Sequence, residues 1–392
     1  MAFARIRAAL AERARTGLQR QPSAFACGSG RWLEVDGRRD LNFASNDYLG
    51  LAQHPAVVAA WQQGARTYGV GSGGSAYITG HSAAHQALIE ALCSFTGYPA
   101  ALLFSSGFAA NHGVLTTLLK AGDRVLQDRL NHASLLDGGL ASGARLERFR
   151  HNDTEDLARR LAKPGAGETL IVSEGVFSMD GDEAPLPQLA RIAAGGDAWL
   201  MIDDAHAIGV LGERGQGSLA QLEPAQLPLY MATFGKALGV GGAFVAGATE
   251  TIDYLHNFCR HAIYTTAMPP AMAVAVHAAL GVMVEQPQIR ARLHGNIRRF
   301  CEGAQALGLP LAPSRSAIQP LVLGGVARTL AVAARLGEAG LRVAAIRPPT
   351  VAAGQARLRI TLSASHAEGD VDRLLDALHQ ALKSEPEDEK NA

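Results

Sequence analysis

The stretch that decides the fold spans residues 199–236, WLMIDDAHAIGVLGERGQGSLAQLEPAQLPLYMATFGK. It contains two uninterrupted apolar runs, at 199–202 and 229–232, and polar side chains follow each run at once. Strands without polar alternation are typical of a parallel sheet covered on both faces. In an open sheet of this kind, ligands bind beyond the carboxyl ends of the strands. The tetrads Asp203-Asp204-Ala205-His206 and Thr233-Phe234-Gly235-Lys236 are therefore predicted to lie in one site.

The same alternation of apolar runs and helical patterns extends on both sides of this stretch. Further apolar runs predict buried strands at 101–104, 124–127, 169–172 and 243–246. Spacing of three to four residues between apolar positions predicts helices at 82–95, 107–119 and 154–162, with Asp153 capping the last. Strands separated by helices predict an α/β domain with a mainly parallel sheet.

The pattern changes near residue 285. A long helix is predicted at 288–307, strands at 318–323, 341–346 and 357–362, and helices at 327–339 and 367–382. We therefore expect an N-terminal helix and arm at 1–45, a large domain at 46–285 and a smaller α+β domain at 286–384. The polar residues 385–392 are expected to form a frayed tail.

Composition excludes several classes of protein. The 392 residues are 48% hydrophobic and carry 36 Lys and Arg against 36 Asp and Glu, which argues against disorder and against a nucleic-acid partner. The four cysteines form no Cys-x-x-Cys pair, so we expect neither disulfides nor a metal site, and a cytoplasmic location. The apolar stretch 262–284 is interrupted by Pro269-Pro270, so no membrane span is expected. Glycine is enriched, at 43 residues.

Three residues at the two central strand ends indicate the chemistry. Lys236 follows a buried strand and has no acidic neighbour close in sequence, which suits Schiff-base formation. Asp203 ends the other strand, and pyridoxal phosphate needs such a carboxylate at its ring nitrogen as well as a lysine for its aldehyde. His206 is placed to bond the ring oxygen. Taken singly, each has an ordinary alternative: a solvated lysine, a paired carboxylate or a core histidine.

Polar residues at other strand ends would complete this site. Ser106-Gly107-Phe108 begins a predicted helix, whose first N–H groups can bind a phosphate, and Thr233 can add a hydroxyl. A plain helix cap is the alternative for this segment. His132 follows another strand and is placed to stack on the ring.

These residues resemble the fold-type I pyridoxal-phosphate enzymes, and more narrowly the α-oxoamine synthase family. The resemblance covers about residues 20–380 and rests on the spacing of DDAH and TFGK together with further segments. These are NDYLGL at 46–51, GSGGS at 71–75, EGVFSMDGD at 174–182, MPP at 268–270, SAIQP at 316–320, RPPTV at 347–351 and RLR at 357–359.

The resemblance implies a role for each matching residue. The catalytic residues would be Lys236, His132, Asp203 and His206. The residues that bind pyridoxal 5'-phosphate would be Lys236, Gly107, Phe108, His132, Ser178, Asp203, His206 and Thr233, with Thr265 or Thr266 added from a second subunit. The residues that bind substrate would be Arg20, Asn46, His132, Arg347 and Thr350.

The resemblance also implies a reaction and partners. The best-matching members of the family join L-alanine to a pimeloyl thioester, either pimeloyl-CoA or the acyl carrier protein form, with loss of carbon dioxide, in biotin biosynthesis. They are homodimers with shared active sites. Sibling enzymes stay open as alternatives: glycine C-acetyltransferase and 5-aminolevulinate synthase use glycine, and serine palmitoyltransferase uses serine.

A dinucleotide-binding enzyme is the distant alternative. Residues 69–74, GVGSGG, satisfy the glycine fingerprint of NAD-dependent oxidoreductases, and Glu90 lies about twenty residues further on. That fingerprint requires a strand directly before it, whereas residues 55–68 are predicted to be helical. A serine hydrolase is disfavoured because GHSAA at 80–84 lacks the second glycine of the nucleophile turn.

Overall fold

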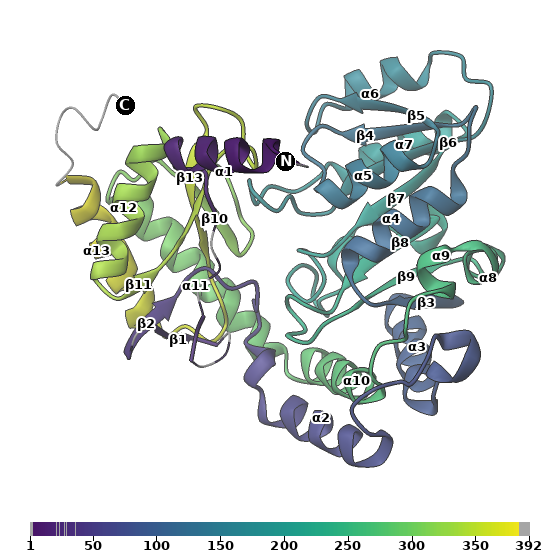
Figure 1. The fold of residues 1–392 in the computed structure, drawn as a ribbon, viewed down its shortest axis with the longest axis horizontal. Coiled ribbons are helices and arrows are strands. Elements are labelled where there is room, and N and C mark those ends of the chain that lie inside the picture. The colour runs from purple at the N-terminus through teal and green to yellow at the C-terminus, as the bar shows by residue number, and fades with distance from the viewer. Residues whose placement is uncertain are drawn as a thin grey trace. The chain divides into compact units, whose positions relative to one another are not determined.

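The computed structural model describes residues 3–20, 22, 24–26, 28, 30–35 and 37–383. Cys27 and the predicted tail at 385–392 lie outside the described residues. Contacts divide the chain into two compact units (Figure 1). The larger unit comprises residues 46–178 and 182–292, and the smaller one combines the described residues of 3–45, 179–181 and 293–383.

A seven-stranded sheet forms the centre of the larger unit, in the order β3-β9-β8-β7-β6-β4-β5. Only β9 is antiparallel to its neighbours. Its strands are β3 (Ala100–Phe104), β4 (Arg124–Asp128), β5 (Arg145–Phe149), β6 (Thr169–Glu174), β7 (Trp199–Asp203), β8 (Leu229–Thr233) and β9 (Ala243–Gly247). The six predicted apolar runs are all confirmed as strands, and the mainly parallel α/β fold is confirmed with them.

The strand β5 is absent from the sequence-based prediction. Its segment is RLERF, and it pairs on one side only, with β4, so it lies at an edge of the sheet. Arg145 and Arg148 are exposed, Leu146 and Glu147 are partly buried, and Phe149 alone is fully buried. An edge strand needs little apolar surface, which explains why no apolar run marks it.

Nine α-helices of the larger unit pack around this sheet. They are α2 (Pro55–Tyr68), α3 (Ala83–Thr96), α4 (Gly107–Leu118), α5 (Ala133–Ala141), α6 (Thr154–Leu161), α7 (Leu186–Gly195), α8 (Thr249–Phe258), α9 (Arg260–Ile263) and α10 (Pro270–Glu285). A buried core joins α4, α5 and α8 to the strands. The predicted cap of α6 is confirmed, since the Asp153 carboxylate accepts the N–H of Asp156 at 2.8 Å.

The apolar stretch at 262–284 lies mostly in α10, which begins after Pro269. Among the described residues, no helix combines the length and hydropathy that a membrane span needs.

The smaller unit contains two three-stranded sheets. One has the order β1-β2-β11 and the other β10-β13-β12. The strands are β1 (Trp32–Val35), β2 (Arg38–Asn42), β10 (Ile318–Gly324), β11 (Leu341–Arg342), β12 (Ala344–Ile346) and β13 (Ala356–Thr361). The helices are α1 (Arg5–Arg15), α11 (Pro287–Ala306), α12 (Val326–Glu338) and α13 (Glu368–Lys383).

The prediction of one strand at 341–346 is wrong. The segment splits at Val343, because β11 pairs in parallel with β2 whereas β12 pairs antiparallel with β13. Its two halves therefore belong to different sheets. The first half pairs Leu341 with Leu41, a partner far away in the sequence that the local pattern does not encode.

Candidate functional site

A lysine, a histidine and a tyrosine form a chain of contacts beyond the ends of β7 and β8. Lys236 Nζ lies 2.8 Å from His206 Nε2. The other ring nitrogen of His206, Nδ1, lies 2.5 Å from the hydroxyl of Tyr48, which also donates to Asn46 Oδ1 at 3.2 Å. Parallel strands deliver their carboxyl ends to the same edge of the sheet, which is why residues 30 positions apart meet here.

The Asp203 carboxylate is held by two donors. Its Oδ1 accepts the N–H of Ala205 at 2.9 Å, and its Oδ2 accepts the side-chain amide of Asn111 at 2.7 Å. The same amide donates to Ser134 Oγ at 2.9 Å. Asn111 is not among the residues predicted from the sequence. It lies one helical turn after Gly107, the start of α4, whereas the prediction considered only the first residues of that helix. A polar residue among the apolar positions of that helix was the available signal.

The adjacent Asp204 points the other way. It accepts bonds from the backbone N–H of Ser218 and from the hydroxyl of Tyr230, each at 2.9 Å. Burial raises the pKa of Asp204 to about 6, although these bonds oppose the rise. Successive residues at a strand end face opposite sides, so of the two carboxylates Asp203 faces the pocket described below and Asp204 stabilises the core.

Glu174, at the end of β6, pairs in register with Asp203, and His132 precedes α5. The Nδ1 of His132 contacts Ser134 Oγ at 2.8 Å, and burial lowers the pKa of the imidazole. Burial raises the pKa of Glu174 well above its ordinary range, and the nearby Asp203 charge raises it further. The backbone N–H of His132 bonds to this carboxyl group. Burial and the Asp203 charge both favour the neutral form of the Glu174 carboxyl group.

The start of α4 forms the remaining wall. Ser106 caps the helix by accepting the N–H of Ala109 at 3.1 Å. A Cβ added to Gly107 would meet no atom closer than 3.7 Å, so neither packing nor a positive φ requires glycine there. Thr233 donates to the carbonyl of Gly242 at 2.8 Å, and its Oγ1 accepts the N–H of Gly235 at 3.3 Å.

These groups enclose a pocket of about 190 Å³. Its lining is Gly107, Phe108, Asn111, His132, Ser134, Glu174, Asp203, Ala205, His206, Met231, Thr233 and Lys236. A helix N-terminus, a carboxylate and a lysine around one pocket match the phosphate, the ring nitrogen and the aldehyde of pyridoxal phosphate. Seven of the eight predicted cofactor residues thus line one pocket. The eighth, Ser178, belongs to the same unit but is not among the lining residues.

The predicted substrate residues are divided between the two units. Asn46 belongs to the larger unit, where it contacts Tyr48. Arg20, Arg347 and Thr350 belong to the smaller unit: Arg20 donates to Thr350 Oγ1 at 3.0 Å, and Arg347 donates to the carbonyl of Gln19 at 3.4 Å.

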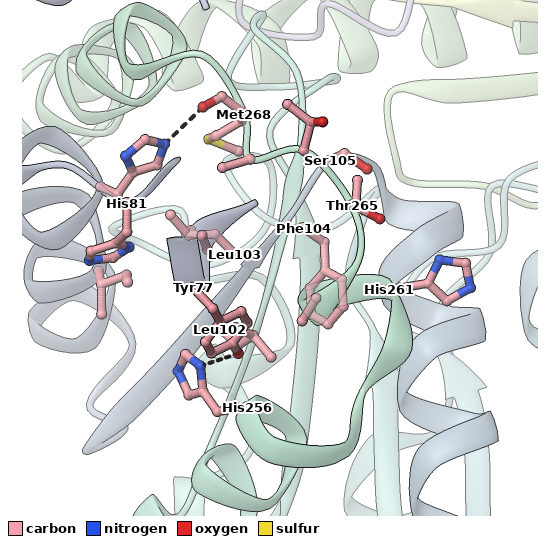
Figure 2. A pocket seen from close by; sticks show the side chains of 16 residues that line it. Tyr77, His81, Leu102, Leu103, Phe104, Ser105, His256, His261, Thr265 and Met268 are labelled. Carbon is pink, nitrogen blue, oxygen red and sulfur yellow. Dashed lines mark hydrogen bonds between the residues drawn. The ribbon is translucent and has the colours of Figure 1, made fainter. Parts of the chain in front are cut away.

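A second pocket of about 260 Å³ lies in the larger unit, away from Lys236 (Figure 2). Four histidines line it, of which His85 Nε2 contacts the carbonyl of Met268 at 2.9 Å and His256 Nδ1 contacts the Tyr77 hydroxyl at 2.8 Å. The predicted partner-facing residues Thr265 and Thr266 also belong to its wall. Within the described part of the chain, no cluster of His, Cys, Asp and Glu is arranged to hold a metal ion.

The fingerprint at 69–74 does not form a dinucleotide site. It follows α2 rather than a strand, and Glu90 lies within α3. The glycine loop instead packs against residue 267: the N–H of Ala267 donates to the carbonyl of Gly74 at 3.0 Å, and Ser72 Oγ donates to the Ala267 carbonyl at 2.8 Å.

Comparisons with known proteins identify the family of this chain. A family model for aminotransferase class I and II matches residues 38–378. An 8-amino-7-oxononanoate synthase of Sodalis glossinidius is 53% identical over 380 residues, which is 97% of each chain. A high-resolution structure of SPT with a PLP internal aldimine has a TM-score of 0.91 at 30% identity and covers 97% of this chain and 98% of its own.

A solved 8-amino-7-oxononanoate synthase from Francisella tularensis has a TM-score of 0.77 at 31% identity and covers 88% of this chain and 98% of its own. The lysine, carboxylate and helix N-terminus of the pocket are the groups that such a fold uses around its cofactor. Together, the family match and the near-full-length identity show that this chain belongs to the aminotransferase class I and II family, among the 8-amino-7-oxononanoate synthases.

Proposed function

We propose that this protein is a pyridoxal-phosphate enzyme that condenses L-alanine with a pimeloyl thioester, releasing carbon dioxide and the thiol. The observation that carries the proposal is the meeting of Lys236 with His206 beside Asp203 in one pocket. The relative of 53% identity supports the choice of substrates.

The residues present fit the cofactor. Lys236 would hold it covalently, and Asp203 would bind the ring nitrogen, since its two donors fix the carboxylate and leave it within the pocket. His206 would bond the ring oxygen, with Ser178 nearby, and His132 would stack on the ring. The start of α4 at Gly107 and Phe108, with Thr233, would bind the phosphate.

When bound, pyridoxal phosphate supplies an electron sink that stabilises negative charge at the amino acid's α-carbon. Lys236, as the free amine, would remove the α-proton of the amino acid and later return a proton to that carbon. Asp203 would bind the ring nitrogen and favour its protonated form. The 2.8 Å contact with His206 would orient Lys236 Nζ.

We also propose which residues bind the substrates. Asn46 and Arg347 would bind the alanine carboxylate, and Arg20 and Thr350 would contact the acyl substrate. The hydrogen bond between Arg20 and Thr350 supports their acting together.

We also propose a homodimer with shared active sites. Several large apolar side chains are exposed in the single chain, among them Val70 at 87%, Ile78 at 79% and Tyr264 at 70%. A second copy would bury them, and Thr265 or Thr266 would then contact the partner's phosphate. We further propose a cytoplasmic location, because Cys93, Cys259 and Cys301 are unpaired.

The central experiment compares thiol release from three substrate pairs by the holoenzyme. We expect thiol release to be faster from alanine with pimeloyl-CoA than from glycine with acetyl-CoA or succinyl-CoA. Pimeloyl carrier protein is tested as a second acyl donor. Borohydride should fix the cofactor on Lys236, as shown by peptide mass. Faster release with either glycine pair would assign the chain to a sibling activity, and a protein that stays colourless with pyridoxal phosphate would refute the cofactor.

A further inference from the structure

An imidazole of the larger unit lies between two carboxylates. His151 Nδ1 is 3.0 Å from Asp128 Oδ1, and His151 Nε2 is 2.8 Å from Asp182 Oδ2. Asp128 is fully buried, and the other two side chains are about a quarter exposed. The ring of Phe177 meets the imidazole edge-on, with centroids 4.5 Å apart and planes at 89°.

The two carboxylates belong to different loops. Asp128 ends β4, and its carboxylate accepts the N–H of Leu130 at 2.8 Å in the loop that leads to His132. Asp182 follows β6, and its carbonyl accepts the N–H of Phe177 at 3.0 Å, which closes the turn that contains Ser178. Each loop therefore carries one residue predicted to contact the cofactor ring.

Asn152, the residue after His151, also connects Asp128 with Asp182. The backbone N–H of Asn152 donates to Asp128 Oδ2 at 2.8 Å, and its side-chain amide donates to Asp182 Oδ2 at 2.9 Å. Two successive residues thus bridge the same pair of carboxylates. Such a doubled arrangement restrains both loops more than a single bond would.

A protonated imidazole satisfies both carboxylates at once, since each ring nitrogen then donates. Burial lowers the pKa of His151, but its bonds to Asp128 and Asp182 outweigh that effect and raise it to about 10. Those two carboxylates are the charged groups that face the ring, and Asn152 and Phe177 supply its neutral neighbours.

We propose that His151 is a positioning residue that ties the Asp128–His132 loop to the Ser178–Asp182 turn and thereby fixes His132 and Ser178 against the cofactor. This inference rests on the proposed function, because it assigns those two residues to the cofactor. His151 would thus support the site although it contacts neither the cofactor nor the substrate.

The test measures cofactor binding rather than turnover alone. His151→Leu removes both bonds, His151→Gln keeps one donor amide, and Asp182→Asn weakens the same tie from its more exposed end. We expect His151→Leu to raise the apparent Kd for pyridoxal phosphate by about tenfold and to alter the circular dichroism per bound cofactor, with His151→Gln in between. His379→Gln, on α13 of the smaller unit, is the matched control and should leave both unchanged.

A double-mutant cycle shows whether the two residues act as a unit. Adding Asp182→Asn to His151→Leu should weaken cofactor binding by less than the two single effects combined, because both changes remove the same bond between His151 and Asp182. Wild-type cofactor affinity and dichroism in both His151 variants would overturn the inference, as would fully additive effects. Because cofactor binding is measured directly, either result is distinct from failure of the proposed condensation, which is read from thiol release by the wild-type enzyme.

Discussion

Replacing Gly239 by alanine tests whether the turn after Lys236 is fixed by close backbone packing. Gly239 has a φ of +68°, and its N–H donates to the Lys236 carbonyl at 2.8 Å. A Cβ at this position would lie 2.2 Å from the backbone N of Ala52 and 2.7 Å from the carbonyl carbon of Leu51. These are main-chain atoms and cannot rotate away as a side chain could.

The cost has two parts. Placing a residue with a Cβ in the left-handed region costs about 1–2 kcal/mol. Overpacking against fixed atoms adds about 1–3 kcal/mol. We therefore expect Gly239→Ala to lower the free energy of unfolding by about 2–5 kcal/mol. If the turn moves instead of unfolding, Lys236 moves with it, and kcat/KM falls together with the visible absorbance of the bound cofactor.

The assay is urea unfolding of the holoenzyme, together with thiol release under the same conditions. Gly281→Ala is the matched control. Gly281 lies inside α10, and no atom would come within 4 Å of an added Cβ, so this substitution should raise the free energy of unfolding by up to about 1 kcal/mol. Gly235→Ala, beside Lys236 but with no contact closer than 3.7 Å, should fold normally. Wild-type stability and activity in Gly239→Ala would refute the packing argument.

Three further outcomes follow from the site. Gly107→Ala should keep wild-type stability, because the added methyl would come no closer than 3.7 Å to any neighbouring atom. It should bind pyridoxal phosphate more weakly, because the methyl would be added where the phosphate is proposed to bind; equal cofactor affinity by titration would contradict this. Asn111→Ala removes the 2.7 Å bond to Asp203 and should lower kcat/KM about tenfold or more, with the cofactor's absorbance spectrum as a second readout; unchanged kinetics would show that Asn111 does not orient the carboxylate. The folded-state pKa of His151 is raised to about 10 from an ordinary value near 6.5, so its stabilisation is complete below pH 6.5 and is lost as the pH rises through 10. His151→Gln should therefore flatten the fall in unfolding free energy over that interval by a few kcal/mol, and parallel pH profiles would count against a protonated imidazole.

The sequence predicted those strands whose apolar residues are consecutive. Each of the six apolar runs became a strand, because a strand buried on both faces must be apolar along its whole length. The segment 145–149 gave no such signal, since an edge strand tolerates charged residues. The 341–346 segment misled the prediction because its pairing partners, β2 and β13, are set by the tertiary fold.

For the site, too, the sequence predicted some contacts and not others. By themselves, the strand-end tetrads indicated that Asp203, His206 and Lys236 share a pocket, because parallel strands bring their carboxyl ends to one edge. Spacing alone did not show that Asn111 holds Asp203 or that Tyr48 contacts His206. Those contacts join elements separated by 92 and 158 residues.

Residue types at short spacing were enough to predict the class of fold, the lysine–aspartate pair and the family. Which of the two adjacent aspartates faces the pocket, and why position 239 is glycine, depends on contacts between segments that are distant in the sequence. The tertiary structure likewise decided that His151 lies between Asp128 and Asp182. Hydrogen bonds and backbone contacts act over about 3 Å in space, whatever the separation along the chain, so the fold had to bring these groups together before their roles could be seen.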